Sequence, residues 1–232
     1  MITPPIKNIV QGVMSTNIAT YNTTILKTLS LFIITLLSVF VTYTLITPTT
    51  VFVSVLLSGI LSIILLLLTP KYLSYKQIAF PIALLEGIGI GAITFMIEQK
   101  VPGVGIKAVL ATMFSFVIVY ALYALKIIKV TPTLIKATTY GLYTALIGIF
   151  AILILSLFKV IVLTSLILNV IFGFTLLLGL SCLIINFQEV FTAVENKVHK
   201  DEEWGLAISL LISIILIYES FLRLFGINLN ID

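Results

Sequence analysis

The chain has 232 residues, of which 60% are hydrophobic and 9% are charged, and its formal net charge is +4. The apolar residues form continuous runs, whereas polar residues interrupt the core of a soluble domain at helical or strand spacing. The basic residues lie singly at the ends of these runs, as membrane topology requires, so they do not indicate a nucleic-acid partner. We therefore expect an all-α polytopic protein whose surroundings are the lipid bilayer.

The beginning of the chain differs from the rest in composition. Residues 1–24 are polar, contain two prolines and lack the apolar core of a cleavable signal peptide. Their weak apolar pattern fits either a loose tail or an interfacial helix. We expect a seven-helix transmembrane domain over residues 25–224 and a short tail over 225–232.

Seven apolar runs are close to the ~20 residues that a helix needs to cross a bilayer. Residues 160–187 are apolar throughout, which exceeds one span, so we predict an interfacial or re-entrant piece over 160–169 before the sixth span. The charged segment 195–203 is predicted to be a solvated loop. The predicted spans are residues 25–46, 50–68, 78–97, 106–125, 134–157, 170–190 and 204–224.

Lysine and arginine predict the orientation, because cytoplasmic loops carry an excess of both. Nine basic residues fall on the side of the N-terminus and four on the other side, so we expect a cytoplasmic N-terminus and an outside C-terminus. Lysine, isoleucine and leucine usage is typical of bacteria and favours the plasma (inner) membrane. The nine are Lys7, Lys27, Lys71, Lys76, Lys126, Lys129, Lys136, Lys197 and Lys200, and the four are Lys100, Lys107, Lys159 and Arg223.

Glu86 lies near the middle of the third predicted span, within the sequence Ala-Leu-Leu-Glu-Gly-Ile-Gly-Ile-Gly-Ala at 83–92. A carboxylate in lipid costs several kcal/mol, so we expect it to face the protein interior. It then either handles protons or cations, or is a protonated side chain hydrogen-bonded to a neighbouring helix. Gly87 and Gly91 beside it are spaced i, i+4, the small-xxx-small pattern of closely packed membrane helices.

Other polar residues fall at a similar depth. By a rise of ~1.5 Å per residue, Glu86 lies about 12 Å and Ser213 about 14 Å into their spans from the cytoplasmic side. The end of the sixth span adds Asn186, Gln188 and Glu189, and we expect these groups to form one polar layer, because lipid supplies no partners. An i, i+4 ion pair with Arg223 accounts for Glu219.

Several chemistries find no support in the sequence. The lone Cys182 lies in an apolar run, the lone His199 lies in the charged loop, and no set of residues has metal-site spacing. There is no nucleophile-elbow sequence and no phosphate-binding glycine loop. We therefore expect neither an enzyme nor a metal or cofactor.

Motifs spread over most of the chain resemble the Bax inhibitor-1 superfamily, and within it the bacterial YccA-like branch. The resemblance implies six helices around a central C-terminal helix, a pH-sensitive cation leak discussed mainly for calcium, and association with a membrane-bound AAA protease. The order and spacing of the motifs argue against chance. They are Ala-Leu-Leu-Glu-Gly at 83–87, Pro102-Gly103, Val-Thr-Pro at 130–132, Glu203-Trp204 and Leu-Arg-Leu at 222–224.

The sequence departs from this superfamily at its usual acidic pair. The acidic positions of the sixth helix read Asn186 and Gln188, and the partner position in the last helix falls on Ser213. Amide and hydroxyl side chains keep the shape but do not titrate. Glu86 and Glu189 are then the remaining candidates for a pH-sensitive group.

Two functions remain open at this point. The first is a cation leak or proton-linked channel through the bundle, with Glu86 as the titrating group. The second is a modulator of a membrane-bound AAA protease or of other membrane machinery, with the N-terminal tail and the 195–203 loop as contact surfaces.

Overall fold

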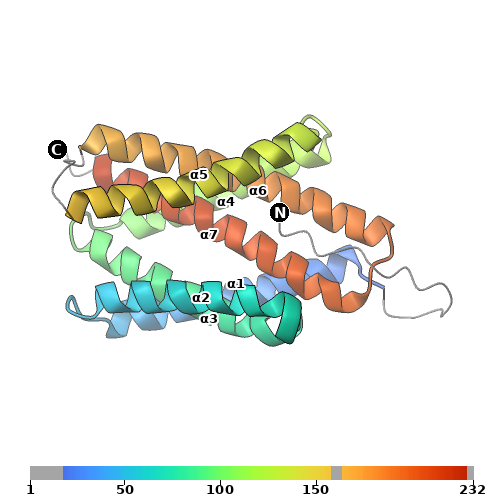
Figure 1. Cartoon of the computed structure of the whole chain (residues 1–232), viewed down its shortest axis with the longest axis horizontal. Helices are drawn as coiled ribbons and strands as arrows, with labels where there is room; N and C mark the ends of the chain where they lie inside the picture. Colours follow the sequence, from blue (N-terminus) through green and yellow to red (C-terminus); the bar gives the residue numbers. More distant parts are fainter. Residues whose placement is uncertain (1–17, 158–163, 229–232) are drawn as a thin grey trace.

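The computed structural model describes residues 18–157 and 164–228, and helices make up most of this part of the chain (Figure 1). The predicted all-α class is confirmed. The elements are α1 (Tyr21–Leu45), α2 (Val51–Tyr72), α3 (Tyr75–Glu98), α4 (Val104–Ala124), α5 (Pro132–Leu157), α6 (Ser165–Glu195), the short 3-10 helix η1 (Lys200–Glu202) and α7 (Glu203–Asn228).

The last helix lies in the middle of the bundle. α7 runs between the group formed by α1, α2 and α3 and the group formed by α4, α5 and α6 (Figure 1). It packs directly on α1, α3, α4 and α6, whereas α2 packs on α3 and α5 packs on α6. The C-terminal helix is therefore central, with four direct neighbours and two helices one layer further out.

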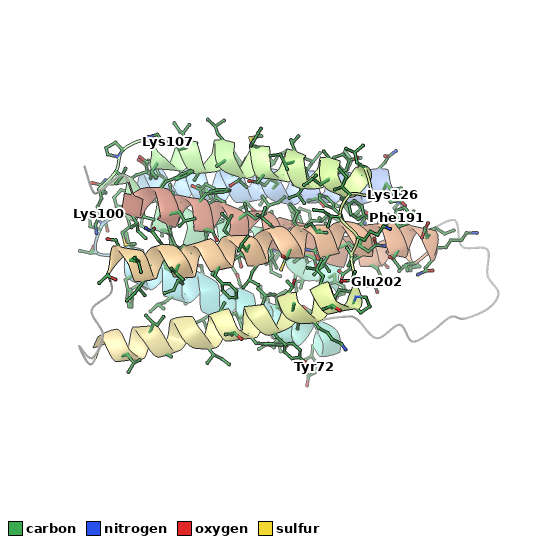
Figure 2. The ribbon with its side chains drawn as sticks, turned by 90° about the horizontal axis from the view of Figure 1, so that it is seen from above. Tyr72, Lys100, Lys107, Lys126, Phe191 and Glu202 are labelled. Atoms are coloured by element: carbon green, nitrogen blue, oxygen red, sulfur yellow. The ribbon has the colours of Figure 1, made fainter. Side chains whose placement is uncertain are left out.

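Six of the helices are long and apolar enough to cross a membrane: α1, α2 up to Thr69, α3, α4, α6 and α7 together with η1. α5 is assigned as the remaining span from its sequence. α6 has 31 residues and is about 46 Å long, so it extends beyond the ~30 Å hydrocarbon core. The lysine-rich end of the bundle, where α1, α3 and α7 begin, carries Lys126 and Glu202, and the opposite end carries Lys100 and Lys107 (Figure 2).

The predicted break before the sixth span is wrong for residues 165–169. α6 begins at Ser165 and continues without interruption, because the Thr164 side chain accepts the Ile167 N–H and starts the helix there. Residues 160–163 of the predicted re-entrant piece lie in the gap between the described segments.

Several other helix boundaries also differ from the prediction. α1 begins at Tyr21, inside the predicted tail, whereas residues 1–17 lie outside the described part of the chain. α2 continues past its predicted end to Tyr72, and α3 begins at Tyr75, so the loop predicted between them is only two residues long. A capping box explains the early start of α3, since the Ser74 N–H donates to Gln77 Oε1.

The contact between α1 and α3 is unusually close. A Cβ atom at Gly87 would lie 2.5 Å from Ser38 Cβ, and one at Gly91 would lie 2.8 Å from Thr42 Cβ. The Ser38 hydroxyl donates to the Leu84 carbonyl oxygen across this contact, at 2.8 Å. Hydroxyl side chains on α1 thus meet small residues on α3. The buried face of α1 consists of Thr24, Thr28, Leu31, Thr35 and Ser38, and the small residues of α3 are Ala79, Ala83, Gly87 and Gly91.

Candidate functional site

Glu86 is half-buried on the side of α3 that faces α7. Ile82 and Ile90, one turn before and after it, belong to the apolar core that includes Ile208 and Leu211 of α7. Residues four apart share a helix face, so Glu86 lies between two layers of this core. The carboxyl group therefore faces protein.

Ser62 of α2 is the polar neighbour of this carboxyl group. The side chain of Ser62 is buried, with 3% of its surface exposed, and it interacts electrostatically with Glu86. Its hydroxyl oxygen makes no hydrogen bond of regular geometry with the described residues. Ser62 is thus a polar neighbour of the Glu86 carboxyl group, in a contact that does not have the geometry of a regular hydrogen bond.

Glu219 of α7 is the charged group that acts on Glu86 across the helix interface. Glu219 itself forms the predicted i, i+4 pair with Arg223, with 3.1 Å between Oε2 and the guanidinium nitrogen Nη2. The Arg223 guanidinium also lies over the Phe172 ring, 5.3 Å from its centroid. The charge of Glu219 is therefore balanced, whereas no ion pair in the described part of the chain balances Glu86.

Asn186 and Ser213 are brought together between α6 and α7. Asn186 Nδ2 donates to Ser213 Oγ at 2.6 Å and to the Ser209 carbonyl oxygen at 2.8 Å. The Ser213 hydroxyl also lies 3.1 Å from that carbonyl oxygen, to which it can donate. These groups form a neutral hydrogen-bonded cluster.

The other residues of the expected polar layer lie apart from this cluster. Gln188 Oε1 accepts the Tyr123 hydroxyl of α4 at 3.1 Å, and its amide nitrogen donates to Thr192 Oγ1. Glu189 is half-buried on α6. Within the described residues, no hydrogen bond joins Glu86 to Asn186 or Ser213, so the structure separates a neutral α6–α7 cluster from the carboxyl group on α3.

Sequence reasoning missed a second buried carboxylate, Glu203, which was assigned to the solvated loop. No part of its surface is exposed. Its Oε1 accepts the Thr20 N–H at 2.8 Å and the Thr23 hydroxyl. Its Oε2 accepts no hydrogen bond of regular geometry from the described residues, and the Lys27 ammonium 2.8 Å away balances its charge.

Lys27 and Trp204 complete this cluster. The Lys27 ammonium donates to the Lys200 carbonyl oxygen at 3.2 Å and lies 4.8 Å from the centroid of the Trp204 ring. Trp204 contacts Phe80 of α3, with 5.3 Å between ring centroids. The signal in the sequence is the Glu203-Trp204 pair at a helix start, but a lysine 176 positions earlier cannot be identified as its partner from spacing.

The segment that precedes α1 is attached to the loop before α7. The Ala19 N–H donates to the Val198 carbonyl oxygen at 2.9 Å, and Ile18 forms a β-bridge with His199. We call residues 18–20, Lys27 and 198–204 the N-terminal clamp. It joins the beginnings of α1 and α7 at the lysine-rich end of the bundle.

A metal centre of the usual protein kind is not seen in the described residues, which bring together no group of three His, Cys, Asp or Glu side chains. His199 is exposed and lies 3.4 Å from Asp201 in the loop. Cys182 is a half-buried free thiol on α6.

The helices and the polar groups enclosed between them define a multi-pass α-helical membrane protein. The sequence from residue 6 to residue 229 matches the model of the Bax inhibitor 1 like family, so the chain belongs to this family. No curated protein matches the chain.

Proposed function

We propose that this protein is a pH-sensitive cation leak or proton-linked channel in the plasma (inner) membrane, with Glu86 as the titrating group. The observation that carries the proposal is the position of Glu86: the middle of a span, facing α7, with no cation paired to it in the described residues. Such a carboxylate lowers stability, so a functional role is the simplest reason for it to be there.

The neutral cluster of Asn186 and Ser213 supports Glu86 as the source of pH sensitivity. Neither an amide nor a hydroxyl changes charge at ordinary pH, and both groups are already hydrogen-bonded to each other. A response to pH that arises between the membrane-spanning helices is therefore assigned to a carboxyl group. Glu86 has the position for this role, because it lies against α7, the helix that contacts both halves of the bundle.

The test is cation flux into liposomes that contain the purified protein, followed with an encapsulated indicator between pH 5 and pH 8. We expect flux above that of empty liposomes, and a loss of at least about tenfold in Glu86→Gln, which corresponds to ~1.4 kcal/mol in barrier height. The control is Glu195→Gln, an exposed carboxyl group at the end of α6, which should leave flux unchanged. Flux equal to that of empty liposomes rejects the proposal.

A second candidate function is the modulation of a membrane-bound AAA protease. The specific observation is that the segment before α1 and the loop before α7 form one joined surface, the N-terminal clamp. Exposed charges lie on this surface at Lys200 and Asp201. A partner that binds the tail would therefore also contact the loop.

This candidate is tested by replacing residues 2–16 with a Gly/Ser segment of the same length, which leaves Ile18, Ala19 and Thr20 in place. We expect loss of co-purification with the protease and an unchanged helical circular dichroism spectrum. Full co-purification of this variant would speak against the tail as the contact.

A further inference from the structure

We propose that a groove between α1 and α4 binds one anionic phospholipid, with an acyl chain along the groove and the headgroup phosphate beside Lys100 and Lys107. The groove lies at the end of the bundle opposite the lysine-rich end, where Figure 2 shows both lysines. This site is independent of the cation flux proposed for Glu86.

The groove forms because α1 and α4 pack on different helices. α1 packs mainly on α3 and α4 packs mainly on α7, and within the described residues α1 and α4 do not pack on each other. The space between them has a volume of about 320 Å³, within the range of ~300–1,000 Å³ that is usual for small-molecule sites. Its walls are Leu36, Val39, Phe40 and Tyr43 of α1, and Gly105, Ile106, Val109 and Leu110 of α4.

The polar groups on the floor of the groove already have partners. The two carboxylate oxygens of Glu98 accept the N–H groups of Gly103 and Gly105, each at 2.7 Å. The hydroxyl groups of Thr94 and Tyr218 are hydrogen-bonded to each other at 3.0 Å. The floor therefore needs no polar ligand, and the walls present mainly carbon. A hydrocarbon chain fits such a lining, because it leaves no polar group without a partner.

The groove has a polar end and an apolar end, as a phospholipid has. Its polar end lies where α3 ends at Glu98 and α1 is two residues from its own end at Tyr43. Tyrosine is enriched at the headgroup level of membranes. From Tyr43 the groove continues to Leu36, a distance of about 10 Å by the rise of a helix. Its side is open, since the Phe40 side chain is 67% exposed. A lipid that enters from the bilayer therefore keeps its headgroup at the end of the bundle.

Lys100 and Lys107 supply the charge for the headgroup. Both are exposed, and neither forms an ion pair within the described residues. Lys100 lies two residues after Glu98, and Lys107 is one turn before Leu110 on α4. When Glu98 is ionised, the two lysines leave one positive charge at the polar end of the groove. The single negative charge of a phosphatidylglycerol headgroup neutralises it, whereas a zwitterionic headgroup does not.

The test is photo-crosslinking of the purified protein in detergent, with a phosphatidylglycerol that carries a diazirine in one acyl chain. Mass spectrometry of the peptides locates the label. We expect labelling to concentrate on the α1 and α4 walls of the groove. Unlabelled phosphatidylglycerol should compete about tenfold better than phosphatidylcholine with the same chains, because two lysines favour the anionic headgroup.

Three variants separate the headgroup contact from the acyl-chain contact. Lys100→Gln combined with Lys107→Gln should remove the preference for phosphatidylglycerol and keep labelling in the groove. Leu110→Trp fills the groove and should remove the labelling itself. Leu57→Trp on α2 is the matched control, since Leu57 is 55% exposed, Leu110 is 62% exposed, and Leu57 does not line the groove. This control should keep both the labelling and the preference.

Four results would overturn the proposal: labelling spread evenly over the lipid-facing helices, equal competition by the two lipids, an unchanged preference in the lysine double variant, or undiminished groove labelling in Leu110→Trp. The single variants Lys100→Gln and Lys107→Gln give the same comparison if the double variant is unstable. Each of them should lose part of the preference, and an unchanged preference in both would also contradict the site.

Discussion

Glu203 and Glu86, two of the glutamates on the helices of this bundle, have different surroundings. Glu203 is the first residue of α7, is fully covered, and has a lysine, a threonine hydroxyl and a backbone N–H as partners. Glu86 lies in the middle of α3 and has a serine hydroxyl and a second, already paired carboxylate as its neighbours. The same side chain is compensated in one place and uncompensated in the other.

The difference separates a structural role from a functional one. A buried charge with a complete set of partners holds helices in place. Removing one partner leaves the other charge unpaired in a low-dielectric environment, which destabilises the fold. A buried charge without a protein cation is available to a mobile ion. We therefore assign Glu203 to the assembly of the bundle, and we propose that Glu86 serves the activity of the protein.

The largest effect is expected from breaking the N-terminal clamp. Lys27→Met leaves Glu203 without its cation and should lower the free energy of unfolding by about 2–3 kcal/mol, somewhat below the usual range for buried ion pairs, because the pair lies at the end of the bundle near water. Thermal or denaturant unfolding in detergent measures it. The double variant Lys27→Met with Glu203→Gln should recover part of the loss. A double variant less stable than Lys27→Met would contradict this assignment.

The next largest effect concerns the close contact between α3 and α1. Gly87→Ala places a methyl group 2.5 Å from Ser38 Cβ and 2.6 Å from the Thr35 carbonyl oxygen, which should cost about 1–3 kcal/mol of stability. Gly59→Ala on α2 is the matched control, since a Cβ there has no atom within 4 Å and alanine favours the helix. Equal melting temperatures for the two variants would show that α1 and α3 are not in close contact.

A third variant introduces a carboxylate into the neutral cluster. Asn186→Asp removes the donor to the Ser209 carbonyl oxygen and should cost about 1–2 kcal/mol at pH 8. A protonated aspartic acid can donate again, so the folded variant holds a proton that the unfolded chain releases, and its stability should rise as the pH falls. Unfolding at pH 5 and pH 8, compared with the unchanged sequence, measures this. If the stability of Asn186→Asp depended on pH in the same way as that of the original chain, this prediction would be wrong.

The smallest effect on stability is expected at Glu86. Glu86→Gln keeps the size of the side chain and breaks no ion pair among the described residues, so the free energy of unfolding should change by less than about 1 kcal/mol. The two glutamate variants test the difference between Glu203 and Glu86, because Glu203→Gln should lower the stability of the protein and Glu86→Gln should lower its cation flux. The melting temperatures of Glu86→Gln and Glu203→Gln, each compared with that of the unchanged protein, test this expectation. A large loss in Glu86→Gln would make its role structural.

Features that depend on one stretch of chain could be predicted from the sequence. Continuous apolar runs predicted the all-α polytopic class, and i, i+4 spacing predicted the pair of Glu219 and Arg223. The helix itself sets these distances, so spacing along the chain is enough to derive them. The continuity of α6 is a local feature that was predicted wrongly, because apolar length alone does not show where a helix begins.

Only the tertiary structure decided which helix faces meet. Lys27 and Glu203 are far apart in sequence, as are Ser62 and Glu86 on their separate helices, and no periodicity relates the members of either pair. The hydroxyl-rich face of α1 likewise has a meaning only when it lies against the small residues of α3. The physical reason is that the partners of a buried polar group come from whichever helices pack around it, and the packing of the whole bundle sets their distances.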